Sequence, residues 1–156
     1  MSSPSANPIL PPAQPPKIYR AMKKNPADDQ PVVGPHSSSE LGVRPGIDIS
    51  VDSAGNVVLD STGMSVAPGW RDLDFTRIPK RLRHIVPGAK GANNTFCFTI
   101  GEGPFQNGIV ANGLELIPDQ GHPIIHGVIA PERVVPLAQY QTDLANTRAA
   151  WQIDET

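Results

Sequence analysis

The segment Lys17-Ile18-Tyr19-Arg20-Ala21-Met22-Lys23 begins the foldable part of this 156-residue chain. Its alternation predicts a β-strand with Arg20 on the same face as Ile18 and Met22, because successive strand side chains point to opposite faces. An arginine in such an apolar run must reach water at a sheet edge or meet an anion. Its planar guanidinium suits a diphosphate. Arg20 is therefore a candidate anion-binding residue, with an exposed strand arginine as the alternative.

The residues before this strand have a different composition. Residues 1–16 contain six prolines among Ser, Ala and Asn, a composition that cannot bury enough apolar area to offset the entropy of ordering. We expect a disordered, Pro-rich arm over 1–16 and one folded domain over 17–156. The arm is either a solvated tail or a docking segment for a partner.

Short apolar segments separated by Pro and Gly follow along the chain and predict a strand-rich fold. The expected strands are residues 47–51 and 57–59, which form a hairpin, and then 63–67, 95–100, 108–117 and 124–130. From Pro136 the period changes to three and four residues, which predicts a C-terminal amphipathic helix with one face formed by Leu137, Tyr140, Leu144, Thr147 and Trp151. The fold class is therefore α+β.

Charge and composition exclude several kinds of partner. The net charge of −2 gives no general attraction to nucleic acid or anionic membranes, and no apolar run is long enough to span a bilayer. The histidines show no metal-like clustering except His122 and His126, where Pro123 opposes the helix that such a pair needs, so we expect no metal. Cys97 is the only cysteine, which fits a buried, inert thiol in a cytoplasmic protein.

Three further segments carry candidate functional residues. In Thr62-Gly63-Met64-Ser65 a glycine lets the backbone approach a ligand, and Ser65 can bond a ribose hydroxyl; an ordinary glycine turn is the alternative. His126 lies in a short apolar strand, where it either lines a pocket or is a satisfied core histidine. The basic residues of segment 77–83 could bind a diphosphate or form a solvated face.

The order of these segments resembles the ADP-ribosyltransferase-like toxins that bacterial type VI secretion systems export. The matching pieces span residues 17–151 and are segments 18–21, 48–58, 63–66, 78–79 and 126–131, followed by Tyr140, Leu144, Arg148 and Trp151 of the expected helix. The resemblance implies a split, strand-rich fold that holds NAD between two small sheets.

The resemblance also implies roles for individual residues. It assigns Arg20, Ser65 and His126 to catalysis. It assigns NAD binding to Tyr19, Arg20, Thr62, Gly63, Ser65 and Trp70, with packing as the alternative role of Trp70. It further implies a toxin that acts in the cytoplasm on a macromolecular target and a cognate immunity protein that neutralises it.

One feature of the resembling family is missing. No Glu-x-Glu or Gln-x-Glu occurs late in the chain, and neither Glu115 nor Glu132 lies in such a motif. ADP-ribosyl transfer, NAD hydrolysis and a pocket without a reaction therefore stay open. A non-catalytic interaction protein that uses the Pro-rich arm and segment 77–83 is the alternative of another class. An NAD-using RNA 2′-phosphotransferase is a third, against which the net charge argues.

Overall fold

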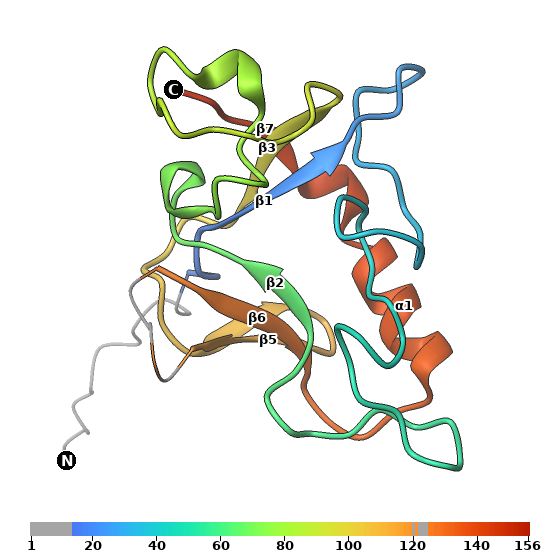
Figure 1. The fold of residues 1–156 in the computed structure, drawn as a ribbon. Helices are drawn as coiled ribbons and strands as arrows, with labels where there is room; N and C mark the ends of the chain where they lie inside the picture. Colours follow the sequence, from blue (N-terminus) through green and yellow to red (C-terminus); the bar gives the residue numbers. More distant parts are fainter. Residues whose placement is uncertain (1–13, 120, 122–124) are drawn as a thin grey trace, which may run out of the picture.

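The computed structural model describes residues 14–119, 121 and 125–156, and it is a mixed α+β structure made mostly of sheet (Figure 1). The first antiparallel sheet has the order β1 (Ile18–Lys23), β3 (Thr95–Ile100), β7 (Gln152–Ile153). The second has the order β2 (Met64–Val66), β6 (Gly127–Pro131), β5 (Leu114–Pro118), β4 (Gly108–Ala111). The predicted fold class is confirmed at this level.

Strand β1 contributes to two separate apolar clusters, as its alternation predicts. Ile18 and Met22 point into the main core, whereas Tyr19 points into a second cluster with Trp70 and Cys97. The two sheets meet at this strand, because the backbone of Tyr19 exchanges hydrogen bonds with Ala67 just beyond β2. In Figure 1 the sheet of β1 lies above the sheet of β2, β6 and β5.

Strand β2 is an edge strand with one face buried and one face exposed. Met64 and Val66 are buried and Ser65 between them is exposed. Gly63 precedes the strand, and a Cβ there would lie 2.3 Å from the carbonyl oxygen of Ile129 on β6. A glycine is therefore required for the two backbones to approach each other.

Two segments differ from their predicted form. The expected single strand over 108–117 is the hairpin of β4 and β5, and its turn includes Gly113 with a φ of 79°, a conformation that favours glycine. The expected hairpin of 47–51 and 57–59 is reduced to an isolated bridge between Val51 and Val57 around a turn at Gly55.

The C-terminal helix is shorter than its periodicity predicts. Helix α1 covers Leu137–Ala145, and a 3-10 helix, η3, covers Arg148–Ala150. The chain must then extend to join β3 as β7, so the helix cannot continue to Trp151. Tyr140, Leu144 and Trp151 are nevertheless buried in the main core. Two more 3-10 helices are η1 (Trp70–Asp72) and η2 (Lys80–Leu82).

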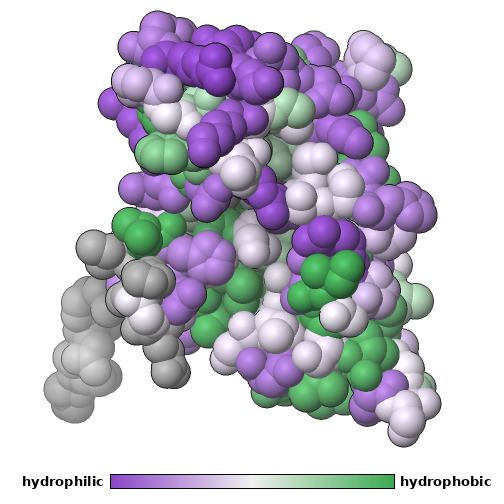
Figure 2. Space-filling view, viewed as in Figure 1, coloured by the Kyte–Doolittle hydropathy of each residue, from purple (hydrophilic) through white to green (hydrophobic). Residues whose placement is uncertain are grey.

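The N-terminal arm is described only at its end. Residues 1–13 lie outside the described residues, whereas Pro16 is buried and forms a bridge with Gly103. On the face shown in Figure 2, hydrophilic residues dominate the upper part and apolar residues gather in the lower part. Over the described part of the chain, no helix has the length and apolar character that a membrane span needs.

Candidate functional site

The side chain of Arg20 is held by main-chain oxygens. Arg20 is 4% exposed. Its Nε and Nη2 donate to the carbonyl oxygen of Glu40 at 3.2 and 3.0 Å, and its Nη1 donates to that of Ser65 at 2.8 Å. A guanidinium has five N–H groups, so these three bonds leave one N–H on each Nη for other acceptors. Arg20 thus joins β1 to β2 and still has donors to offer.

The environment of Arg20 is unusual for a cation. Burial and then the nearby charge of Arg77 lower the pKa of Arg20 to about 10, while Asp48 opposes the shift. The guanidinium therefore stays charged at neutral pH but is poorly solvated. A buried cation without a carboxylate in direct contact gains free energy from an anionic ligand.

A cavity of about 130 Å³ adjoins Arg20, and we call it the arginine cavity. Strands β1 and β2 supply Arg20 and Ser65, the loop after η1 supplies Asp74 and Arg77, and the residue before β6 supplies His126. Ser65 is the exposed residue of β2, between buried Met64 and Val66. All three predicted catalytic residues, Arg20, Ser65 and His126, therefore line one cavity.

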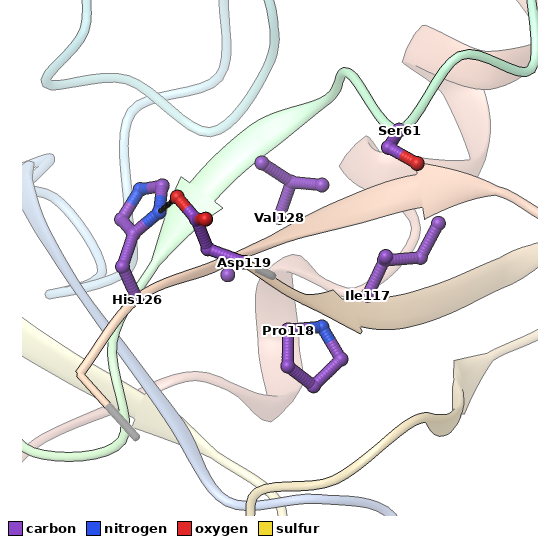
Figure 3. Close-up of a pocket in the computed structure, with 7 residues that line it drawn as sticks. Ser61, Ile117, Pro118, Asp119, His126 and Val128 are labelled. Atoms are coloured by element: carbon purple, nitrogen blue, oxygen red, sulfur yellow. Dashed lines mark hydrogen bonds and ion pairs between the residues drawn. The ribbon is translucent and has the colours of Figure 1, made fainter. Parts of the chain in front are cut away.

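Two larger cavities share lining residues with the arginine cavity. His126 also lines a cavity of about 360 Å³ with Ser61, Ile117 and Val128, which we call the histidine cavity (Figure 3). Arg77 also lines a polar cavity of about 460 Å³ with Lys23. The arginine cavity thus shares His126 with the histidine cavity, and Ala21 and Arg77 with the polar cavity.

His126 is oriented by a carboxylate. Its Nδ1 lies 3.2 Å from Oδ2 of Asp119, and the dashed line in Figure 3 marks this pair. An ionised carboxylate only accepts hydrogen bonds, so the neutral imidazole donates its Nδ1–H and carries its lone pair on Nε2. The main chains are also tied, because Asp119 N donates to the carbonyl oxygen of His126 at 2.9 Å. The dyad therefore fixes both the tautomer and the position of the ring.

Ser61 does not complete a nucleophile–histidine–aspartate arrangement. Its φ of 64° is rare for a residue other than glycine. Figure 3 nevertheless places Ser61 at the opposite end of the histidine cavity from His126. A nucleophile must lie within hydrogen-bond reach of its base, so the geometry supports no serine nucleophile here.

Tyr140 supports the wall formed by β2 and β6. Its hydroxyl donates to the carbonyl oxygen of Ile129 and accepts from the backbone N–H of Met64. Burial raises the pKa of Tyr140 far above its ordinary value, so the phenol stays neutral. The wall that carries Ser65 and His126 is therefore fixed from behind by the first turns of α1.

The structure places the other predicted NAD-binding residues away from these cavities. Tyr19 and Trp70 are buried in the second cluster, with their polar atoms bonded to Asp154 and Thr156 near the C-terminus. The Thr62 hydroxyl donates to Asp60 at 2.6 Å. Gly63 serves the close approach of β2 to β6. None of these four residues lines one of the three cavities.

The basic segment 77–83 is not a uniform solvated face. Arg81 forms a paired ion contact with Glu155, at 2.7 and 2.6 Å, and Arg83 donates to the carbonyl oxygen of Ala89. Arg77 donates to the carbonyl oxygen of Ser38 at 3.0 Å and lines two cavities. Lys80, Arg81 and Arg83 are exposed, whereas Arg77 is half-buried and lines two cavities.

Sequence reasoning missed Asp74 and Asp119 and did not single out Arg77 within the basic segment. Asp74 follows the 3-10 helix η1, and hydrogen bonds from Thr76 lower the pKa of its carboxyl group. Asp119 directly follows β5 and Arg77 precedes buried Ile78. The signal available in the sequence was a polar residue next to a buried segment. This signal does not tell which polar residues lie together in the folded protein.

Comparisons with known proteins assign no family, since no protein-family model, curated protein or solved structure matches the chain. Within the described residues, no group of three or more His, Cys, Asp or Glu side chains could hold a metal ion. His122, the partner of His126 in the pair considered from the sequence, lies outside these residues.

The thiol of Cys97 is not a nucleophile in this structure. Burial raises its pKa to about 12, so the thiol stays protonated.

Proposed function

We propose that this protein is an ADP-ribosyltransferase-like toxin that binds NAD in the arginine cavity and cleaves its nicotinamide–ribose bond. The observation that carries the proposal is the convergence of Arg20, Arg77, Ser65 and His126 on one cavity where the two sheets meet. A buried guanidinium with spare N–H groups next to a second arginine suits a diphosphate.

The sizes of the cavities are compatible with a dinucleotide that crosses more than one of them. Ligand pockets typically enclose about 300 to 1,000 Å³, so the arginine cavity of about 130 Å³ holds only part of NAD. The diphosphate would lie at Arg20 and Arg77. The rest of the molecule would extend past His126 or past Arg77 into the adjoining hollows.

The reaction would depend on fixed charges. Cleavage of the nicotinamide–ribose bond develops positive charge on the ribose, which a preorganised carboxylate stabilises. Asp74 is the carboxylate among the residues that line the arginine cavity. It would take the part that the late glutamate plays in the resembling toxins, while Ser65 would bond a ribose hydroxyl. The arginines would hold the diphosphate in place.

A toxin of this kind acts in the cytoplasm of a target cell on a macromolecule that the chain itself does not identify. Its producer needs a cognate immunity protein. We expect that protein to bind over the three cavities, because covering His126 and Arg77 would block access to Arg20. The test is whether a gene next to the toxin gene restores growth.

The first experiment expresses the wild-type chain under tight control in a bacterial cytoplasm and follows growth and intracellular NAD. We expect growth arrest with loss of NAD. Arg77→Gln should abolish both effects, and the exposed Arg133→Gln, which removes the same charge outside the three cavities, should abolish neither. Arg77 is preferred to Arg20 because the bonds of Arg20 also hold β1 to β2.

Other outcomes would point to other functions. Arrest with unchanged NAD and with full toxicity of Arg77→Gln would contradict the proposal. It would favour the non-catalytic interaction protein, whose surfaces would be the Pro-rich arm and the exposed part of segment 77–83. Calorimetry with purified protein and NAD separates binding from turnover, and we expect Arg77→Gln to weaken NAD binding at least tenfold.

A further inference from the structure

The histidine cavity differs in chemistry from the arginine cavity although His126 lines both. Two arginines line the arginine cavity, whereas among the described residues no lysine or arginine lines the histidine cavity. The histidine cavity has apolar walls formed by Ile117, Pro118 and Val128, and Figure 3 shows these side chains around it. A phosphate therefore gains nothing there, while a neutral group on an apolar stem does.

His126 lines both cavities, and its ring nitrogen Nδ1 lies 3.2 Å from Oδ2 of Asp119. Its Nδ1–H is directed to Asp119, so the lone pair of Nε2 is available to accept a proton. Among the described residues, the other charged groups that share a cavity with His126 are Arg20 of β1 and Asp74 and Arg77 of the loop after η1. Asp119 is the charged residue that lines the histidine cavity.

We infer that the histidine cavity binds the acceptor of the transferred group, a hydroxyl on a largely apolar stem, with His126 as its general base and Asp119 as a positioning residue. This inference rests on the proposed function, because the donor is the NAD held at Arg20 and Arg77. It adds to that function the chemical class of the acceptor and a positioning role for Asp119.

The bonds change as follows. The acceptor oxygen forms a bond to C1′ of the ribose, and the bond from C1′ to the nicotinamide nitrogen breaks. Its electron pair leaves with nicotinamide and neutralises the positive ring. The hydroxyl proton passes to Nε2 of His126 and then to water. With water in place of the hydroxyl, the same steps hydrolyse NAD.

The test uses the purified full chain, NAD and 1-propanol as the probe acceptor, with products separated by chromatography and identified by mass. We expect the wild type to form propyl ADP-ribose beside ADP-ribose. General-base catalysis contributes about 10²- to 10⁴-fold, so His126→Gln should lower kcat at least about 100-fold. KM for NAD should change by less than about threefold.

Asp119→Asn separates positioning from a structural role. We expect it to lower kcat about tenfold or more, because an amide no longer selects the Nδ1–H tautomer, and to displace the limb of the pH–rate profile that His126→Gln abolishes. Glu132→Gln neutralises an exposed carboxylate outside the three cavities and should leave kcat and the profile unchanged. Thermal unfolding checks that each variant is folded.

The acceptor site itself is tested by filling it. Ile117 lines the histidine cavity but not the arginine cavity. Ile117→Phe should reduce the propyl product at least fivefold relative to ADP-ribose. Ile109→Phe makes the same change at an exposed residue of β4 and should preserve the product ratio.

The failures can be told apart. If the wild type consumes NAD while His126→Gln and Asp119→Asn keep its kcat and pH profile, the inference is overturned and the proposed function stands. If Ile117→Phe leaves the product ratio unchanged, the acceptor does not bind in this cavity. A wild type that neither binds nor consumes NAD overturns both.

Discussion

Two walls of the arginine cavity are built in opposite ways. On the β1 wall, Arg20 is 4% exposed and donates three hydrogen bonds to main-chain oxygens. On the β6 wall, the His126 side chain is 42% exposed and its ring nitrogen meets one carboxylate. Arg20 therefore lines the cavity and also joins β1 to β2, whereas His126 lines it with a half-exposed ring.

The largest expected effect on stability is that of Arg20→Ala. Two main-chain oxygens lose their donors, each at a cost of about 1 to 3 kcal/mol, so we expect the free energy of unfolding to fall by about 2 to 6 kcal/mol. Urea denaturation measures this difference. Arg133→Ala is the matched control at an exposed arginine. An Arg20→Ala protein as stable as the wild type would show that the bonds of Arg20 do not stabilise the junction of β1 and β2.

Tyr140→Phe tests the support behind the β6 wall. It leaves the carbonyl oxygen of Ile129 and the N–H of Met64 without the phenol that joins them. We expect a loss of about 1 to 3 kcal/mol, measured by the same denaturation, together with weaker NAD binding because β2 and β6 carry Ser65 and His126. Unchanged stability would show that water or another group satisfies both atoms.

Asp154→Asn tests the β1 wall from the other side. The Tyr19 hydroxyl, then Thr156, hold the pKa of Asp154 below its ordinary value, with Tyr19 Oη and Asp154 Oδ2 2.6 Å apart. The carboxylate therefore adds stability that is fully present above its unfolded pKa and is lost as the pH falls through its lower folded pKa.

We expect Asp154→Asn to cost about 1 kcal/mol at pH 7 and to flatten the fall in stability between about pH 4 and more acidic values. Denaturation midpoints over this range measure it. An acid limb identical to that of the wild type would contradict the assignment of this carboxylate.

The smallest expected effect on stability is that of His126→Gln. Substitution of a half-exposed side chain away from the core usually changes stability by less than about 0.5 kcal/mol, although we expect a large loss of activity. Thermal unfolding and NAD turnover on one preparation make the contrast with Arg20→Ala direct. If His126→Gln destabilised the protein as much as Arg20→Ala, the expected difference between the two walls would be contradicted.

Part of the fold followed from local pattern. The alternation of residues 17–23 predicted β1 (Ile18–Lys23) and which side chains share each of its faces, and the apolar segment of residues 95–100 predicted β3. The helix was predicted too long, since periodicity continues through Thr147 and Trp151, whereas the backbone turns to place β7 beside β3. Periodicity predicts which side chains are buried. Thr147 and Trp151 are buried, as the periodicity predicts, although the chain leaves the helix before it reaches them.

The candidate site was predicted less completely. Arg20, Ser65 and His126 were identified and do line one cavity. Tyr19 and Trp70 were expected to contact NAD, but the structure places them in the second cluster with their polar atoms bonded to the C-terminal residues. Amphipathic aromatic residues suit a ligand or a core equally well, so their residue type alone could not decide.

The sequence by itself determined a strand-rich α+β fold and the faces of its clearest strands, and it named Arg20, Ser65 and His126 as candidates. Only the tertiary structure decided that Asp119 orients His126 and that Arg77 and Asp74 join Arg20. The physical reason is that hydrophobic alternation is a pattern among residues that are neighbours in the chain. The meeting of side chains from β1, β2, the loop after η1 and the start of β6 depends on how the two sheets pack against each other.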